Sequence, residues 1–144
     1  MVRQSIVDSI LENLKKIKID NGFYSNAGLN VFEWMEKTLE DRDFPALIIR
    51  DSSSKVNETS SLEHILKIEV YIAIKGKNSI WSMREVSSDV LKTFGIVENI
   101  LNFKINYLGF ESLVEQRESM YSGTRMEFEV IYQTRKFEQW IQNY

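Results

Sequence analysis

Catalysis by a nucleophile and a base needs particular side chains placed close together. Among its 144 residues there is one histidine, His64, and there is no cysteine. A hydroxyl nucleophile needs a base within hydrogen-bond reach and a third group that orients the base. Ser60 and Ser61 lie close to His64 in the sequence, but nothing around them resembles the glycine-flanked turn of serine hydrolases. We therefore interpret His64 as an ordinary residue at the start of a strand.

Acidic side chains gather between positions 33 and 43, where a cluster could bind a metal ion or take part in acid–base catalysis. A site for a hard cation usually alternates oxygen ligands and has a glycine at the turn. The sequence lacks that pattern, and Lys37 and Arg42 interrupt the acidic residues. We therefore interpret the segment as a solvated turn. Its acidic residues are Glu33, Glu36, Glu40, Asp41 and Asp43.

Motifs for phosphate groups, redox chemistry and metals are also missing from the sequence. The 6 glycines are scattered and form neither the dinucleotide-binding pattern nor a phosphate-binding loop. Without cysteine the chain has no disulfide and no thiolate ligand for a metal. We therefore expect a protein that holds no cofactor and no metal and is not an enzyme.

The charge balance bears on the choice of partners. The sequence has 18 basic and 21 acidic residues, a net charge of −3, whereas duplex nucleic acid is bound by clustered lysine and arginine. This balance argues against duplex nucleic acid as the main partner, but it allows an assembly that encloses DNA without gripping it. The N-terminus does not resemble a signal peptide, and no stretch approaches 18 uninterrupted apolar residues. We therefore expect a cytosolic protein with no membrane partner.

The periodicity of apolar residues predicts the elements of the first half of the chain. Residues 2–18 have apolar side chains at helical spacing, and Asn21-Gly22 is a typical helix end. Residues 30–39 change to a period near two, which predicts a strand, and residues 44–50 predict a second, short strand. Residues 51–61 are nearly all small or polar, and we expect them to form a mobile loop.

The clearest strand and the second helix come next. Residues 66–75 alternate between apolar and mostly polar side chains, which predicts a strand with one buried face. Ser79 is a suitable N-cap for a helix that ends at Gly95. A linker is expected near residues 96–102.

Two further strands complete the predicted sheet. The first begins at Phe103 and continues past Gly109, which is expected to mark a bulge or bend. A turn around Ser122-Gly123 then leads to a last strand in which apolar and charged residues alternate, from Arg125 to Tyr132.

These elements predict a single α+β domain over residues 1–134. Their order is α-β-β-β-α-β-β, with a mostly antiparallel sheet and both helices packed on one face. The other face is expected to carry charges of both signs that support one another on neighbouring strands. We take four of them as candidate interface residues, namely Lys67, Glu69, Arg125 and Glu127.

The last ten residues, 135–144, are predicted to form a docking tail. Their apolar side chains recur at the spacing of one helical stripe, and so short a helix is marginal unless it packs against something. The stripe docks either on its own domain or on a neighbouring subunit, since tryptophan and tyrosine are common interface anchors. Its candidate interface residues are Phe137, Trp140, Ile141 and Tyr144.

The order of elements and several segments resemble a known family. The first two strands end in Phe44-Pro45-Ala46-Leu47-Ile48-Ile49, a polar loop follows, and the second helix contains the stretch from Met83 to Gly95. The last strand closes with the stretch from Phe128 to Thr134. Over most of residues 1–134 the chain resembles the tail terminator proteins of long-tailed bacteriophages, which are often found in prophages. The aromatic tail has no counterpart in this resemblance.

The resemblance implies a structural role. The family implies a ring, usually a hexamer in the assembled particle, at the head-proximal end of the tail tube. The ring stops the growth of the tube, offers a surface for joining the head and lets DNA pass through without specific binding. Its partners would be copies of itself, the tail tube and head-completion proteins, first in the bacterial host cytoplasm and then in the virion tail. The family implies no catalytic residues.

The residues leave a second class of function open. A small bacterial binding or regulatory module without enzymatic activity would need a concave pocket, lined by apolar side chains with a few convergent polar groups. An assembly protein would instead form a ring whose population depends on concentration. An enzyme is the class that the sequence favours least, because no acid, base and nucleophile are paired in it.

Overall fold

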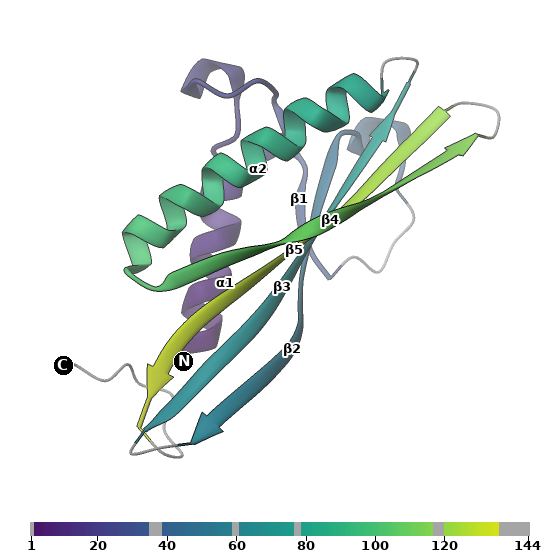
Figure 1. Cartoon of the computed structure of the whole chain (residues 1–144). Coiled ribbons are helices and arrows are strands. Elements are labelled where there is room, and N and C mark those ends of the chain that lie inside the picture. The colour runs from purple at the N-terminus through teal and green to yellow at the C-terminus, as the bar shows by residue number, and fades with distance from the viewer. Residues whose placement is uncertain (1, 35–38, 59–60, 77–78, 117–119, 136–144) are drawn as a thin grey trace.

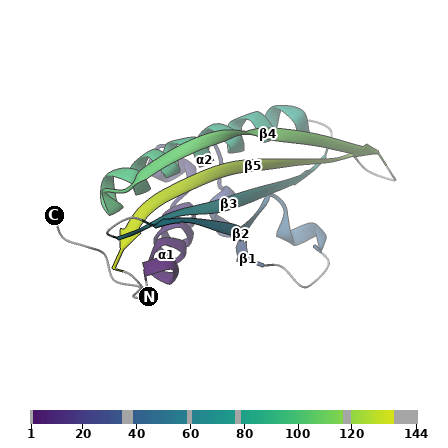
Figure 2. The ribbon, with the colours of Figure 1, turned by 60° about the horizontal axis from the view of Figure 1, so that its bottom comes forward.

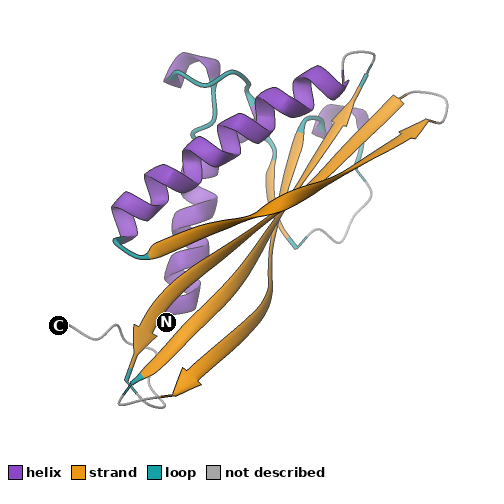
Figure 3. Ribbon diagram, in the orientation of Figure 1, coloured by secondary structure: helices purple, strands orange, loops and turns teal. Residues whose placement is uncertain are grey.

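The part of the chain that the structure describes folds as two α-helices and a five-stranded sheet (Figure 1, Figure 3). The structure is a computed structural model and describes residues 2–34, 39–58, 61–76, 79–116 and 120–135. The helices are α1 (Val2–Leu14) and α2 (Ser79–Leu101). The strands are β1 (Val31–Glu33), β2 (Ala46–Glu58), β3 (Leu62–Lys75), β4 (Lys104–Gln116) and β5 (Met120–Thr134).

The strands lie side by side in the order β1-β2-β3-β5-β4 (Figure 2). Within the described residues β1 runs parallel to β2, and the other neighbouring pairs are antiparallel. The predicted α+β class with a mostly antiparallel sheet is therefore confirmed. The order of elements differs in detail, because three short 3-10 helices are inserted: Ile19–Asn21, Ala27–Leu29 and Asp41–Asp43.

The core lies between the helices and one face of the sheet. On β3, Leu66, Ile68 and Val70 are completely buried, because alternate residues of a strand share a face. On β5, Phe128 stacks against Phe94 of α2, with ring centroids 3.7 Å apart. Both helices therefore pack on the same face, as predicted. Their buried residues in this core include Ile6, Ile10, Leu14, Val86, Val90 and Val97.

The strand predicted over residues 30–39 is too long. Only Val31–Glu33 form β1, and Trp34 has a φ of 48°, in the left-handed region that interrupts strand geometry. Its N–H still donates to the carbonyl of Ile49 at 3.1 Å, so Trp34 stays against β2 while the chain turns. Residues 35–38 lie outside the described residues.

The loop predicted over residues 51–61 is also wrong. β2 continues to Glu58, which pairs with Leu62 at the start of β3, after a bulge between Asp51 and Ser53. The side chains of this half of β2 are mostly exposed, so the apolar pattern that marks a buried strand is missing. Hydrogen bonds of the backbone to β3 hold the strand, and they do not depend on side-chain type.

α2 is longer than predicted and absorbs the linker expected near residues 96–102. Gly95 lies inside the helix, and Val97 is completely buried in the core beyond it. The helix ends before Asn102, whose φ of 56° is the left-handed conformation that asparagine tolerates at a helix end. Within the described residues, neither helix combines the length and the apolar character needed to cross a membrane.

Two glycine predictions in the last hairpin have opposite outcomes. The bulge at Gly109 is confirmed by a register shift between Tyr107 and Gly109, where φ is 126°. The turn at Ser122-Gly123 is wrong, since both residues lie within β5, opposite Ile74 and Ala73.

The segment between α1 and β1 packs closely against the end of α1. The helix ends at Leu14 rather than at residue 18, and Gly22, with a φ of 86°, follows the first 3-10 helix. The N–H of Gly28 donates to the carbonyl of Ile17 at 2.9 Å. A Cβ atom at Gly28 would lie 2.7 Å from the carbonyl oxygens of Leu14, Lys15 and Ile17. Glycine is therefore required here by the close approach of two backbone segments.

Replacing Gly28 with alanine should lower the free energy of unfolding by about 1–3 kcal/mol, because the new methyl group meets backbone atoms that have little room to move. The matched control is Gly95→Ala, where a Cβ atom would meet nothing within 4 Å. That change should raise stability by about 0.5–1 kcal/mol through helix propensity. Urea unfolding of both variants measures the difference, and an unchanged Gly28→Ala would contradict the packing described.

Candidate functional site

The face of the sheet turned away from the helices, called the helix-free face below, carries a charged network. The Nζ atom of Lys67 lies 3.5 Å from Glu127 Oε2 and 4.0 Å from Glu69 Oε1. Glu127 Oε1 in turn lies 3.3 Å from Arg125 Nε. The structure thus brings together all four sheet residues predicted from the sequence, through the pairing of Glu69 with Glu127 across β3 and β5. Their role as an interface stays a prediction.

Beside this network the helix-free face is hollowed into a basin of about 690 Å³. Its floor contains Ala73 and Gly123, which lie directly opposite each other on β3 and β5. Two residues this small leave space between larger neighbours, and this explains the hollow. We call it the sheet basin. It is lined by Trp34, Ile48, Arg50, Tyr71, Ile72, Ala73, Glu111, Gly123, Thr124 and Arg125.

Arg50 lies between two aromatic rings at one side of the sheet basin. Its Cζ atom is 4.6 Å from the centre of the Trp34 ring and 5.5 Å from that of Tyr71. Its Nη1 donates a long hydrogen bond of 3.5 Å to the Tyr71 hydroxyl, which itself donates to Glu69 Oε2 at 2.9 Å. The Nε atom of Arg50 is buried without a hydrogen-bond partner.

Trp34 is held at the basin by an ion pair on the edge of the sheet. Its Nε1–H donates to Asp51 Oδ1 at 2.8 Å, and Arg3 Nε donates to Asp51 Oδ2 at 2.7 Å. Burial alone would raise the pKa of Asp51, but the hydrogen bonds from Trp34 and Arg3 outweigh it and hold the pKa below 3.8. Asp51 therefore stays ionised and keeps Trp34 in place near neutral pH.

Sequence reasoning did not identify Trp34 and Arg50 as a pair. Arg50 follows the alternation of residues 46–50, which places it on the same face as Ile48. Trp34 lies within the longer strand predicted over residues 30–39, and the turn that brings its ring over Arg50 leaves no periodic signal. The available clue was that the two residues belong to consecutive predicted strands, with Arg50 at the end of the second.

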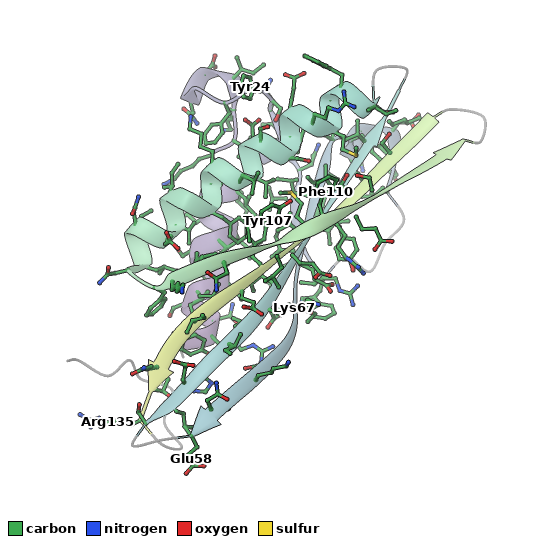
Figure 4. The ribbon with its side chains drawn as sticks, viewed as in Figure 1. Tyr24, Glu58, Lys67, Tyr107, Phe110 and Arg135 are labelled. Carbon is green, nitrogen blue, oxygen red and sulfur yellow. The ribbon has the colours of Figure 1, made fainter. Side chains whose placement is uncertain are left out.

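β4 forms one edge of the sheet and exposes large apolar side chains (Figure 4). Tyr107 is 43% exposed, Leu108 46% and Phe110 67%. Leu91 of α2 and Tyr107 line a shallow groove of about 170 Å³ between α2 and β4. We call Leu91, Tyr107, Leu108 and Phe110 the β4 edge patch. A long strand edge with exposed apolar residues can pair with another chain.

His64 is buried near the start of β3. Its ring stacks on Tyr132 with centroids 4.7 Å apart, and its Nε2 lies 2.7 Å from Thr134 Oγ1. Thr134 is itself completely buried, which gives a substrate no access to this hydroxyl. Ser60 lies outside the described residues, and Ser61 is buried.

The acidic segment of residues 33–43 has structural contacts. Glu40 and Asp43 form a reciprocal capping box on the third 3-10 helix, and Glu40 also pairs with Arg42 at 3.1 Å. Asp41 pairs with Lys75 of β3, while Glu36 lies outside the described residues. Among the residues that the structure describes, no group of three or more acidic or histidine side chains could hold a metal ion.

One further carboxylate is buried, and its contacts are also within the fold. Asp89 of α2 is 1% exposed and accepts hydrogen bonds from the backbone N–H groups of Tyr24 and Ser25, at 3.0 and 2.9 Å. The Ser25 hydroxyl donates a third at 2.6 Å. Asp89 therefore anchors the segment that leads from α1 to β1.

The predicted docking stripe falls on residues 136–144. Phe137, Trp140, Ile141 and Tyr144 all lie outside the described residues. β5 ends at Thr134, which pairs with Leu62 at the start of β3, and Arg135 is exposed. The two docking alternatives for the stripe stay predictions.

Comparison with known proteins adds no family to these observations. No protein-family model matches the chain, and no curated protein matches it. The features of the structure that bear on function are the charged network, the sheet basin and the β4 edge patch.

The environment of His64 predicts how stability depends on pH. Burial lowers the pKa of His64 below its ordinary 6.5, so the unfolded chain binds a proton at higher pH than the folded chain does. The free energy of unfolding should therefore be highest above the unfolded pKa and decrease as the pH falls from 6.5 to the lower folded pKa. Urea unfolding at about pH 7.5 and about pH 5.5 measures this change. His64→Gln should show a smaller change, and an equal change in both proteins would contradict the assignment.

Proposed function

We propose that this protein is a structural assembly subunit of the tail-terminator type. It would join copies of itself into a ring that caps a phage tail tube and offers a surface to the head. The observation that carries this proposal is the presence of two open sheet edges on one chain, one of which exposes the apolar β4 edge patch.

The two edges lie at opposite sides of the sheet. At one side is β4. At the other, β1 pairs with β2 only at Leu47–Ile49, so the outer edge of β2 from residue 50 to residue 58 has no strand partner among the described residues. If the β4 edge of one copy lies along the β2 edge of the next, the contact is head-to-tail. Repeated contacts of this type close into a ring when the rotation between copies allows it.

The helix-free face is the surface that we assign to the tail tube or to head-completion proteins. The charged network of Lys67, Glu69, Arg125 and Glu127 presents both signs in a fixed pattern. Such patterns select a partner and its orientation more than they add affinity. A net charge of −3 suits a ring through which DNA passes, since tight phosphate contacts would retain the DNA.

A second candidate function, a small binding or regulatory module without enzymatic activity, is favoured by one observation. The volume of the sheet basin, about 690 Å³, lies in the range of small-molecule sites, and its lining combines apolar surface with few polar groups. A protein that remains monomeric with the tail tube present and binds a ligand in the basin would support this function instead.

Phe110→Asp should weaken self-association, because it places a charge in the centre of the β4 edge patch and a buried charge without a partner is costly. The matched control is Tyr24→Asp, because the two side chains are equally accessible: Tyr24 is 69% exposed and Phe110 is 67% exposed. Tyr24, however, lies between α1 and β1, away from both sheet edges (Figure 4). Mass photometry and negative-stain images over a range of concentrations measure the oligomer. We expect rings in the wild type and in Tyr24→Asp, but not in Phe110→Asp.

The same measurement should be made with polymerising tail-tube protein from the same genome, because some subunits assemble only on their partner. The expected result is shorter tubes that carry a ring at one end. Tubes of unchanged length without a ring would contradict the tail-terminator role. Rings that persist in Phe110→Asp would contradict the assigned edge contact and leave the role itself standing.

Removal of residues 136–144 separates the two docking alternatives for the aromatic stripe. If Phe137, Trp140, Ile141 and Tyr144 dock on a neighbouring subunit, the truncated chain should lose the oligomer while its unfolding midpoint as a monomer stays close to that of the full chain. An unchanged oligomer would rule out this alternative, and a lower monomer stability would indicate docking on the same domain. Mass photometry and thermal unfolding of both chains measure these quantities.

A further inference from the structure

Arg50 forms no direct ion pair with an acidic side chain within the part of the chain that the structure describes. Two other basic residues of the helix-free face, Arg125 and Lys67, are paired directly with carboxylates. Arg125 Nη2 lies 2.9 Å from Glu111 Oε2, and Lys67 lies within 4.0 Å of both Glu69 and Glu127. Arg50 lies opposite Glu69 in the β2–β3 register, but it reaches that carboxylate only through the Tyr71 hydroxyl, which accepts from Arg50 and donates to Glu69. Its other neighbours are the faces of the Trp34 and Tyr71 rings.

The aromatic neighbours do not replace a counter-ion for Arg50. Stacking over Trp34 and Tyr71 stabilises the cation and fixes the plane of the guanidinium. The Nε atom is buried without a hydrogen-bond partner, as is that of Arg125, so a ligand would contact the Nη atoms instead. A guanidinium that is oriented, partly desolvated and without a direct ion pair is prepared to receive an anion.

The sheet basin determines what kind of anion fits. Its floor at Ala73 and Gly123 and its side at Ile48 are apolar, and its volume of about 690 Å³ is larger than an isolated carboxylate needs. An apolar floor flanked by the rings of Trp34 and Tyr71 suits a flat apolar or aromatic body.

The surrounding charges limit the anion to a single negative charge. Glu111 lines the sheet basin, and Glu69 and Glu127 lie in the adjacent network. These three carboxylates outnumber Lys67 and Arg125, the two cations with which they pair, so a second negative charge on a ligand would be disfavoured. A monocarboxylate meets the Nη atoms of Arg50 with the least repulsion.

We infer that the sheet basin binds a small organic acid, a monocarboxylate carried on a flat aromatic or apolar body. The carboxylate accepts hydrogen bonds from the Nη atoms of Arg50, and the body lies over Ala73 and Gly123. Trp34 and Tyr71 form the sides of the site and hold Arg50 in orientation. This site is separate from the β4 edge patch and does not rest on the proposed assembly role.

The inference is tested with three probes of one shape, which are 2-naphthoate, 2-naphthalenemethanol and 2-naphthylmethylamine. Titration into the ¹⁵N-labelled full chain, followed by NMR, measures affinity and location together. We expect 2-naphthoate to shift the amide signals of Arg50, Tyr71, Ala73 and Gly123. We expect it to bind about 10- to 100-fold more tightly than the alcohol, because a charge-assisted hydrogen bond contributes about 1.5–3 kcal/mol. The amine should bind most weakly.

Variants then assign the affinity to the basin. Arg50→Met should reduce the affinity for 2-naphthoate to that of the alcohol, and Ala73→Leu should block both by filling the floor. The matched control is Arg84→Met, on the exposed side of α2, which should leave the affinities for 2-naphthoate and for the alcohol unchanged. If Arg50→Met does not fold, the probe series on the wild type and Ala73→Leu still decide the question.

Three results would overturn the inference. The first is that no probe shifts any amide signal at its solubility limit. The second is that the acid and the alcohol bind with equal affinity, and the third is that the shifted amide signals lie away from the sheet basin. Ring formation is measured separately, so a failure of this site and a failure of the assembly role are distinguishable.

Discussion

Burial of one face of β3 and β5 is the constraint on which the rest of the structure depends. Leu66, Ile68 and Val70 on β3 and Phe128 on β5 lie in one buried core with the apolar faces of both helices. Side chains alternate along a strand, so burying these residues commits their neighbours to the opposite face. A shift of either strand by one residue would bury Lys67 or Glu127 and expose the apolar set. The polar residues of these strands therefore lie on the helix-free face, because the apolar residues are committed to the helix-covered face.

The features of the helix-free face follow from which residues the register places opposite one another. Glu69 lies opposite Glu127 and Tyr71 opposite Arg125, which creates the charged network. One further pair along, Ala73 lies opposite Gly123, and the lack of side-chain volume there creates the sheet basin. The network and the basin are thus neighbours on the same two strands. In this arrangement Arg125 forms direct ion pairs with Glu111 and Glu127, while Arg50, across the basin, forms none among the described residues.

The basin and the β4 edge share one strand, and this links the two proposals physically. Glu111 lies on β4, lines the sheet basin and pairs with Arg125, and Phe110 beside it belongs to the β4 edge patch. A neighbouring copy along β4 would therefore lie close to the rim of the basin.

The sequence by itself determined the α+β class, the mostly antiparallel sheet, the buried strand over residues 66–75 and the charged character of its outer face. These follow from periodicity, which reports the burial of side chains. It also located the bulge at Gly109.

Tertiary structure decided the features that periodicity does not report. Backbone pairing with β3 extended β2 through a polar stretch to Glu58, the core contact of Val97 carried α2 past Gly95, and the turn at Trp34 shortened β1. The same turn placed the Trp34 ring over Arg50, a contact between side chains 16 positions apart in the printed sequence. Such contacts depend on where strands meet in space, and local patterning carries no record of that.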